Sequence, residues 1–368
     1  MHSEELAQLF EAGVAAVRGD SAVKSALKAT SVSYPDQIIA VGKAATAMAS
    51  AATEAFPKAP VLIITKYKHS EGAPPKAEVI EAAHPVLDEN SLRAGRRLRE
   101  VISAMPSGSN LLMLVSGGAS ALAEDPANGL DLAGLSRKTE ELLGSGADIH
   151  AMNAVRKELS QIKGGKLLSG FHGSRVTTLA ISDVQGDALG VIGSGIGDAP
   201  ANPQFEFDPH IVASNARARQ SVLDAASARN LPAYDYGETL YEDIVSLAPK
   251  IAAKLKTSAP GIVVMGGEPT VVLPENPGRG GRNQALALMI AREIADTTDL
   301  QVLVAGTDGT DGPTDAAGAI VDGSTWELSG EDALACADAG SWLDARDALL
   351  TTGPTGTNVM DLLIAWKG

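Results

Sequence analysis

Residues 111–122 read Leu111-Leu112-Met113-Leu114-Val115-Ser116-Gly117-Gly118-Ala119-Ser120-Ala121-Leu122. A continuous aliphatic run of this kind is typical of a strand that is buried on both faces, as in a parallel sheet. The two glycines after it allow a tight turn, and the small residues that follow favour a helix. The stretch therefore predicts a strand, a glycine turn and a helix in direct succession.

The same pattern recurs along the chain. Further short aliphatic runs end in Gly, Ser, Thr or Asp at residues 38–41, 61–64, 178–181, 262–265, 302–305 and 349–352. Helical periodicity follows or separates them at residues 43–55, 91–105, 153–168, 214–229, 240–255 and 282–295, and Leu6, Leu9, Phe10, Val14 and Val17 form one stripe of an N-terminal helix. Strands that alternate with helices predict parallel sheets with right-handed crossovers, so we expect an α/β fold.

The length of 368 residues is about twice the commonest domain size, which predicts two domains. The best boundary is the Pro- and Gly-containing stretch Thr257-Ser258-Ala259-Pro260-Gly261. We therefore expect one domain at residues 1–257 and another at 258–368. A chain that crosses back between the domains is also compatible with the sequence.

The composition restricts the partners. A formal charge of −15 argues against nucleic acid and anionic membranes, but a cleft lined by Lys and Arg can still bind a small anion. The single cysteine, Cys336, fits a reducing compartment, and the sequence has neither a signal peptide nor an apolar run of membrane-spanning length. We expect a cytoplasmic protein with small-molecule partners, and an oligomer is compatible with the sequence.

Unusual residues follow several strands, and ligands bind at the carboxyl ends of strands in open α/β sheets. Ser116, Gly117, Gly118 and Ser120 offer hydroxyl groups and free backbone N–H groups, which suits a phosphate or another anion; the alternative is an ordinary tight turn. Lys43 lies where a helix begins, and a cation in that position is favoured when it meets an anion. A solvated surface lysine is the alternative.

Two acidic segments also follow strands. Asp183 and Asp187 lie four residues apart, and Mg²⁺ binds one or two carboxylates together with phosphate oxygens, although Asp after a strand more often caps a turn. Residues 306–315 contain Asp308, Asp311 and Asp315 among glycines, and their spacing does not match an EF-hand. Binding of Mg²⁺ or of substrate hydroxyl groups fits this loop better.

The remaining candidates are basic or lie in glycine turns. Arg279, Gly280 and Arg282 lie in Gly278-Arg279-Gly280-Gly281-Arg282, where arginine forks match phosphate and carboxylate groups. Arg156 and Lys163 are seven residues apart and would share one helix face, either as an anion site or as a solvated face. The turn at residues 353–358 ends the last predicted strand and is also suited to anions.

Several familiar motifs are absent. The P-loop, the GxGxxG fingerprint, the protein-kinase motifs, the GxSxG elbow and the HExxH zinc motif do not occur, and residues 193–197 break GxGxxG at its third glycine.

Taken together, the segments resemble the MOFRL-type glycerate kinases, a family once labelled hydroxypyruvate reductase. The resemblance runs in order through residues 41–44, 83–88, 115–122, 153–157, 162–165, 181–187 and 266–268, and its most specific stretches are 278–283, 305–318 and 352–358. Glu158 stands where the family has His, and Ile196-Gly197 replaces the family's Pro-Thr.

The resemblance implies a Rossmann-like N-terminal domain with a mostly parallel sheet, a smaller α/β C-terminal MOFRL domain, and an active site between them. It also implies transfer of phosphate from ATP, with Mg²⁺, to the 2-hydroxyl group of D-glycerate. Lys43 and Arg282 match the family's catalytic residues. The substrate and nucleotide contacts would extend to Asn153, Thr355 and Asn358.

These expectations combine into one hypothesis. Glycine turns bind the nucleotide, Asp183, Asp187 and Asp308 hold Mg²⁺, and Lys43 and Arg282 stabilise the transferred phosphoryl group. Arg156 or Lys163 binds the glycerate carboxylate, and Asp183 or Asp311 accepts the hydroxyl proton. The alternatives are an NAD(P)H-dependent hydroxypyruvate reductase, a kinase for a related sugar acid, and a binding protein without catalysis.

Overall fold

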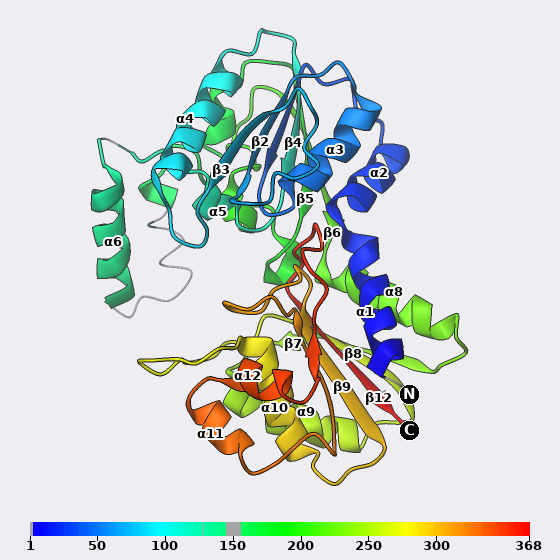
Figure 1. Cartoon of the computed structure of the whole chain (residues 1–368). Coiled ribbons are helices and arrows are strands. Elements are labelled where there is room, and N and C mark those ends of the chain that lie inside the picture. Colours follow the sequence, from blue (N-terminus) through cyan, green and yellow to red (C-terminus); the bar gives the residue numbers. More distant parts are fainter. Residues whose placement is uncertain (1–2, 128, 145–154, 156) are drawn as a thin grey trace. The chain divides into compact units, whose positions relative to one another are not determined.

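The computed structural model describes residues 3–127, 129–144, 155 and 157–368 (Figure 1). The chain divides into two compact units, and neither is continuous in sequence. The parallel-sheet unit contains residues 18–213 and 356–358, and the mixed-sheet unit contains the residues up to 17 together with 214–355 and 359–368. The expected division at 257 and 258 falls inside the mixed-sheet unit, because the strands on its two sides pair with each other.

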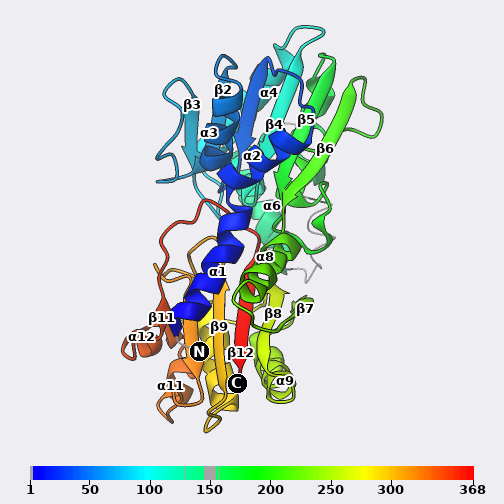
Figure 2. The same ribbon diagram turned by 90° about the vertical axis from the view of Figure 1, so that its right-hand side faces the viewer.

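The parallel-sheet unit is built on a sheet in the order β3-β2-β1-β4-β5-β6 (Figure 2). All its neighbouring strands are parallel. The strands are β1 (Gln37–Val41), β2 (Val61–Lys66), β3 (Glu78–Ala82), β4 (Asn110–Val115), β5 (Arg175–Ile181) and β6 (Glu206–Ala213). This is the strand order of the dinucleotide-binding α/β folds, so the predicted Rossmann-like sheet is confirmed.

Helices cover both faces of this sheet (Figure 1). On one face α2 (Gly19–Ala29) contacts β5 and β6, and α3 (Ala45–Ala55) contacts β1, β2 and β4. On the other face α4 (Glu89–Ser103) contacts β3, and the short α5 (Ala119–Leu122) contacts β2. The unit also contains α6 (Leu132–Gly144) and the 3-10 turns η1 (Leu167–Gly170), η2 (Gln185–Asp187) and η3 (Ile192–Gly195).

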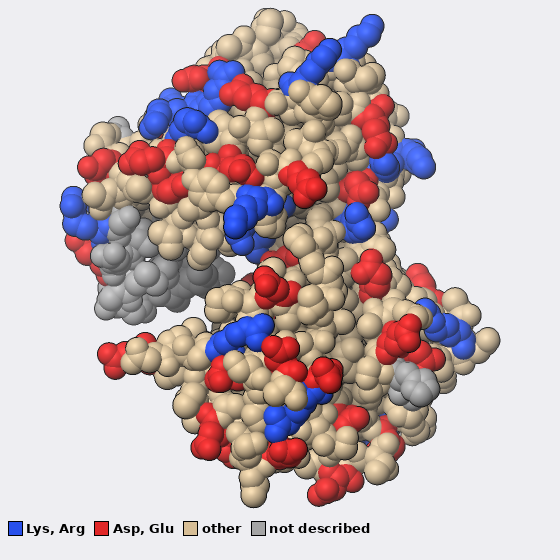
Figure 3. All heavy atoms as spheres, viewed as in Figure 1, with Lys and Arg blue, Asp and Glu red and all other residues tan. Residues whose placement is uncertain are grey.

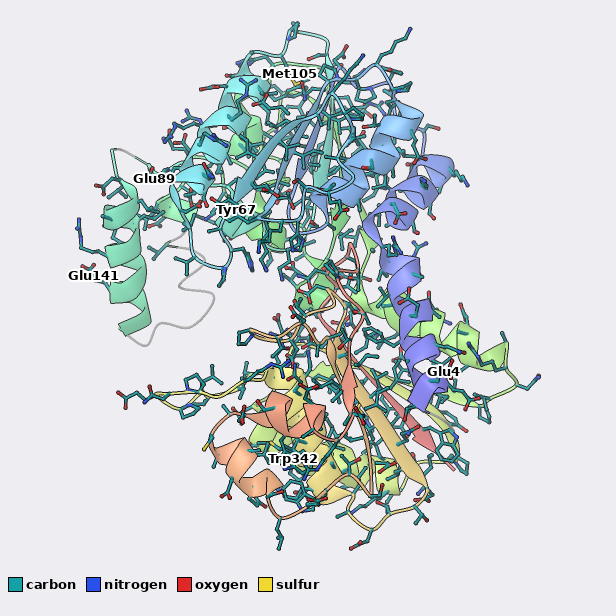
Figure 4. The ribbon with its side chains drawn as sticks, in the orientation of Figure 1. Glu4, Tyr67, Glu89, Met105, Glu141 and Trp342 are labelled. Carbon is teal, nitrogen blue, oxygen red and sulfur yellow. The ribbon has the colours of Figure 1, made fainter. Side chains whose placement is uncertain are left out.

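The sequence explains the core of this unit. The aliphatic runs of β1, β2 and β4 are almost entirely buried, because helices shield both of their faces. Asp88 caps α4 by accepting the Ser91 N–H, and the Ser91 hydroxyl accepts the Asp88 N–H in return. Figure 4 labels Glu89, the first residue of α4, and Tyr67, which follows β2 and donates its hydroxyl hydrogen to Asp88.

The mixed-sheet unit has the strand order β11-β10-β9-β12-β8-β7. The strands are β7 (Ala233–Leu240), β8 (Gly261–Gly267), β9 (Leu300–Gly306), β10 (Gly318–Asp322), β11 (Leu349–Leu350) and β12 (Asp361–Lys367). Only β7 and β8 pair in parallel, and the other neighbours are antiparallel. The expectation of parallel pairing was therefore wrong for this sheet, because β12 runs antiparallel to both β8 and β9.

Two layers of helices enclose the mixed sheet. On one face α1 (Ser3–Val17) packs on α8 (Asn215–Ser227), and all five apolar residues of its predicted stripe are buried. On the other face α9 (Ile244–Lys256) packs on α10 (Arg282–Glu293), with α11 (Gly330–Ala335) and α12 (Ala339–Asp344) beside α10. Trp342, labelled in Figure 4, lies in the core that these helices form.

The helix expected at residues 153–168 is wrong in its second half. Ser160 forms a β-bridge with Pro126, and Gly164 and Gly165 have φ angles of 63° and 80°. The helix therefore ends at Glu158, and the left-handed glycines lie in the turns that residues 161–166 form instead. Asn153 and Arg156 lie outside the described residues.

Basic and acidic side chains alternate over the face of each unit that Figure 3 displays. No helix in the described ranges combines the length and the apolar character that crossing a membrane requires.

Candidate functional site

The parallel sheet changes winding direction between β1 and β4. From β1 the chain continues to β2 and β3 on one side, and from β4 it continues to β5 and β6 on the other. Such a switch point leaves a crevice at the carboxyl ends of the two strands, and ligands of α/β proteins bind there. The sequence places Gly42-Lys43 directly after β1 and Ser116-Gly117-Gly118 directly after β4.

The two turns at this point are hydrogen-bonded to each other. The Lys43 N–H donates to the Gly117 carbonyl oxygen at 2.9 Å, and the Ala44 N–H donates to the Ser116 Oγ at 3.0 Å. Gly42 has a φ of 131°, and a Cβ atom there would lie 2.2 Å from the Ser116 Oγ. Only glycine therefore permits this approach, which fixes the backbone that carries Lys43.

Gly117 also supports a polar pair from distant parts of the chain. A Cβ atom on Gly117 would lie 2.1 Å from Asp183 Oδ2 and 2.6 Å from Asn358 Nδ2. Asp183 follows β5, and Asn358 belongs to the short segment 356–358 that joins this unit. The predicted residues Gly117, Asp183 and Asn358 are thus brought together at the switch point.

Gly118 lies against two further side chains. It has a φ of 84°, and a Cβ atom there would lie 3.2 Å from both Lys43 Cγ and His84 Cδ2. Ser120, in the first turn of α5, has its Oγ 2.9 Å from the Ser194 Oγ. His84 and Ser194 therefore join the predicted cluster, although nothing local in the sequence marks His84 as a neighbour of Gly118.

The expected magnesium ligands are only partly grouped. Asp187 has a buried Oδ1 atom for which no hydrogen-bond partner is found in the described part of the chain, which suits a cation ligand. Asp308 lies in the other unit, and its Oδ1 accepts the N–H and hydroxyl hydrogens of Thr310. Within the described ranges no three His, Cys, Asp or Glu side chains are placed to hold a metal ion. A site made of one or two carboxylates and substrate phosphates does not require such a group.

Lys163 occupies a different position from the one expected. Its side chain is 3% exposed, and its Nζ lies 2.5 Å from the Oε2 of Glu124, which is 2% exposed. The predicted helix face shared with Arg156 fails, because Lys163 lies in the turn region after Leu159. A lysine that is buried and neutralised in this way is poorly placed to bind a substrate carboxylate.

Arg282 is the predicted catalytic residue of the mixed-sheet unit, and two carboxylates surround it. It begins α10, and its Nε and Nη2 donate to Asp361 Oδ2 and Oδ1 at 2.7 and 3.2 Å. Its Nη1 lies 3.1 Å from Glu268 Oε1. Burial alone would lower the pKa of Arg282, but the charge and hydrogen bonds of Asp361 raise it above the ordinary value. Asp361 thus fixes one edge of the guanidinium group, while Glu268 lies near the other.

Asp311 lies directly beneath the start of the same helix. Its two carboxylate oxygens accept the N–H groups of Asn283 and Gln284 at 3.1 and 2.8 Å, so it satisfies donors at the N-terminus of α10. Burial raises the pKa of Asp311 to about 7, although both N–H donors favour the charged form. Because both oxygens are already engaged, the geometry fits support of Arg282 better than proton transfer.

The other predicted residues of this unit lie in packed loops. The Arg279 Nη1 pairs with Asp344 at 3.0 Å, and a Cβ atom on Gly280 would lie 3.0 Å from the Gly340 N atom. The Thr355 hydroxyl donates to the Thr307 carbonyl oxygen at 2.6 Å. These contacts shape the loops around α10 and β9.

Sequence reasoning missed Asp361. It precedes the aliphatic run of β12, and its side chain is only 2% exposed. A single carboxylate directly before a buried apolar run was the available signal, because such a residue needs a partner.

Proteins of known sequence and structure are similar to this chain over almost its whole length. The D-glycerate 2-kinase of Thermotoga maritima is 36% identical over 97% of this chain and 96% of its own length. A crystal structure of glycerate kinase from the same organism superposes with a TM-score of 0.90 at 34% identity, covering 99% of this chain and 98% of that one. This chain belongs to the MOFRL-type glycerate kinase family.

Two family models divide the MOFRL-type chain. A domain of unknown function, DUF4147, matches residues 5–214, and the MOFRL family model matches residues 261–361. Residues 278–283, 305–318 and 352–358 therefore fall in the MOFRL match, and the switch-point turns fall in the other. A relative from Agrobacterium vitis, 34% identical over 88% of this chain and 97% of its own length, is named putative hydroxypyruvate reductase.

Proposed function

We propose that this chain is a glycerate 2-kinase that transfers the γ-phosphoryl group of ATP to the 2-hydroxyl group of D-glycerate. The observation that carries the proposal is the match over 97% of the chain to a D-glycerate 2-kinase, with the switch-point glycines in place. Two hydrogen-bonded turns and a fixed arginine supply what phosphoryl transfer needs most, which is positioning and charge stabilisation.

The parallel-sheet unit supplies the nucleotide contacts in this proposal. The backbone N–H groups of Gly117 and Gly118 contact phosphate oxygens, since glycines let a ligand approach the backbone closely, whereas the Ser116 N–H already donates to the Val41 carbonyl oxygen at 3.0 Å. Asp183 and Asp187 are the residues that would hold Mg²⁺, and the Oδ1 of Asp187, which has no hydrogen-bond partner among the residues that the structure describes, fits that role. When bound, Mg²⁺ neutralises charge on the phosphate oxygens.

In the transfer step, the 2-hydroxyl oxygen of glycerate forms a bond to the γ-phosphorus. The bond from that phosphorus to the bridging oxygen breaks, and ADP leaves with the electron pair. The hydroxyl proton passes to a carboxylate, for which Asp183 is the candidate because Asp311 already accepts two N–H groups. Lys43 and Arg282 stabilise the negative charge that spreads over the phosphoryl oxygens.

The deciding experiment measures ADP release by the purified protein with ATP, Mg²⁺ and D-glycerate, and passes the product directly to enolase. Enolase accepts 2-phosphoglycerate but not the 3-isomer. ADP release with enolase coupling supports the proposal, whereas ADP release without coupling contradicts the position of transfer. Without ADP release, other sugar acids are tested as acceptors.

The second candidate is the reductase, which the name of the Agrobacterium vitis relative favours. Oxidation of NADH or NADPH by hydroxypyruvate in the absence of ATP would support it. The broken glycine pattern at residues 193–197 weighs against a dinucleotide, because the third glycine of the fingerprint is needed for close helix packing.

A further inference from the structure

We infer that Lys163 is a positioning residue: its buried pair with Glu124 holds the left-handed turn Gly193–Gly195 so that the Ser194 hydroxyl lies beside Ser120, where it contacts a phosphate oxygen of the nucleotide. The inference rests on the proposed function. It replaces the expected contact between Lys163 and the substrate carboxylate with an indirect role, and it adds Ser194 to the residues that contact the nucleotide.

The turn that carries Ser194 is held in an unfavourable conformation. Gly193, Ser194 and Gly195 have φ angles of 54°, 59° and 76°. A serine in the left-handed region costs about 1–2 kcal/mol, and such residues persist only where the surroundings fix them. Ser194 is 8% exposed, and its Oγ lies 2.9 Å from the Ser120 Oγ, two residues beyond Gly118. The strained residue therefore points its hydroxyl group at the glycine turn of the switch point.

Two backbone hydrogen bonds support this turn. The Gly164 N–H donates to the Ser194 carbonyl oxygen at 2.8 Å, and the Gly165 N–H donates to the Gly195 carbonyl oxygen at 3.0 Å. A Cβ atom on Gly195 would lie 3.3 Å from the Gly164 Cα atom, which is closer than an ordinary contact. The segment 160–166 therefore packs directly beneath the turn and leaves no space between the two backbones.

The Lys163–Glu124 pair fixes segment 160–166 in turn. Glu124 Oε2 pairs with Lys163 Nζ, and Glu124 Oε1 accepts the Ser160 hydroxyl and the Asp125 N–H. The Ser160 Oγ accepts the N–H groups of Ile162 and Lys163 at 3.2 Å. Hydrogen bonds thus join Glu124 to Ser160 and Lys163, the chain continues through the peptide bond to Gly164, and the Gly164 N–H reaches the Ser194 carbonyl oxygen. Removal of the Lys163 ammonium group leaves the Glu124 carboxylate buried without its paired charge.

The experiment compares the wild-type enzyme with Lys163→Met, Glu124→Gln, Ser194→Ala and the double variant Lys163→Met/Ser194→Ala. Glu124→Gln keeps an acceptor for Ser160 and Asp125 but removes the charge opposite Lys163, so it remains informative if Lys163→Met folds poorly. Lys24→Met is the matched control, because Lys24 and Glu54 form a pair in the same unit with side chains 45% and 65% exposed.

The first measurement is hydrogen exchange of peptides that cover residues 160–168 and 190–198. We expect faster exchange of the Gly164 and Gly165 amides in Lys163→Met and Glu124→Gln, and unchanged exchange in Lys24→Met. Unchanged exchange in both pair variants would overturn the inference. This measurement needs no catalytic activity, so it separates failure of the inference from failure of the proposed function, which the wild-type enzyme reports by showing no glycerate-dependent ADP release.

The second measurement is kcat/KM for ATP at saturating glycerate. Loss of one hydrogen bond to a charged oxygen lowers it about tenfold in Ser194→Ala, and Lys163→Met causes a similar loss. The double variant falls no further than the lower single variant, because both changes remove the same contact. Losses that multiply in the double variant, or a rise in KM for glycerate alone, would overturn the positioning role and favour direct substrate binding.

Discussion

Gly117→Ala tests whether the position of Asp183 matters for catalysis. The added Cβ would lie 2.1 Å from Asp183 Oδ2 and 2.6 Å from Asn358 Nδ2, whereas ordinary contacts between such atoms are longer than 3.4 Å. Both side chains must therefore retreat, the carboxylate by about 1 Å. A displacement of this size at a reacting group costs on the order of a hundredfold in rate, so we expect kcat to fall by that factor.

The fold should tolerate the change, since the φ of Gly117 lies outside the left-handed region and only side chains must move. We expect a stability loss of about 1–2 kcal/mol. The assay is enolase-coupled turnover together with thermal unfolding. Gly170→Ala is the control, because no atom of the described residues lies within 4 Å of its added Cβ. A folded Gly117→Ala variant with kcat within about twofold of the wild type would refute the role assigned to Asp183.

Three further outcomes concern the mixed-sheet unit. Arg282→Ala should lower kcat on the order of a thousandfold, and Arg282→Lys should lower it nearly as much, because Lys cannot keep the two-point contact with Asp361. A near-normal steady-state kcat in either variant would contradict the role of Arg282. Asp361→Asn should lower the free energy of unfolding by about 2 kcal/mol in urea titrations, since a charged guanidinium loses its buried partner; an unchanged midpoint counts against this. The pKa of Asp311, raised to about 7, means that the folded state holds a proton that the unfolded state releases between about pH 4 and 7. The contribution of Asp311 to the free energy of unfolding is therefore complete below about pH 4. It is lost as the pH rises to about 7, by at most about 1.4 kcal/mol per pH unit. Urea titrations of Asp311→Asn between pH 4 and 8 should show a correspondingly weaker dependence on pH, and parallel curves for variant and wild type would contradict the assignment.

Local patterns predicted the strands that are buried on both faces. The aliphatic runs of β1, β2, β4, β5, β8 and β9 appear where the sequence places them, because a continuous apolar run needs cover on both sides. β3, β6 and β7 lie at sheet edges with mixed burial, which obscures their signal. The sequence analysis missed β12, although this strand lies inside the sheet between β9 and β8. The turn at residues 353–358 had been interpreted as the end of the last strand, so the apolar run 362–365 after it was not assigned to a strand.

The candidate site was predictable only where backbone geometry alone defines it. Gly42, Gly117 and Gly118 follow strands, and their lack of a side chain has a local reason that the sequence displays. The pairs Lys163–Glu124 and Arg282–Asp361 join residues 39 and 79 positions apart, so no local pattern reveals them. A spacing of seven residues suggested that Arg156 and Lys163 share a helix face, but the helix ends at Glu158, and Ser160 pairs with Pro126 in a β-bridge.

Lys163 and Arg282 illustrate opposite uses of an ion pair. Lys163 and Glu124 are both buried, so their charges compensate each other inside the protein. Their pairing fixes the backbone of the segments that carry them. Arg282 has a side chain that is 33% exposed while Asp361 is 2% exposed, so the buried carboxylate holds the Nε and Nη2 edge of the guanidinium group, and the Nη1 atom lies 3.1 Å from the more exposed Glu268. Asp361 therefore orients Arg282 while part of the arginine side chain stays exposed to solvent. In a protein with a net charge of −15, a cation held in one geometry stabilises transition-state charge more effectively than a mobile one, because its orientation requires no reorganisation during the reaction.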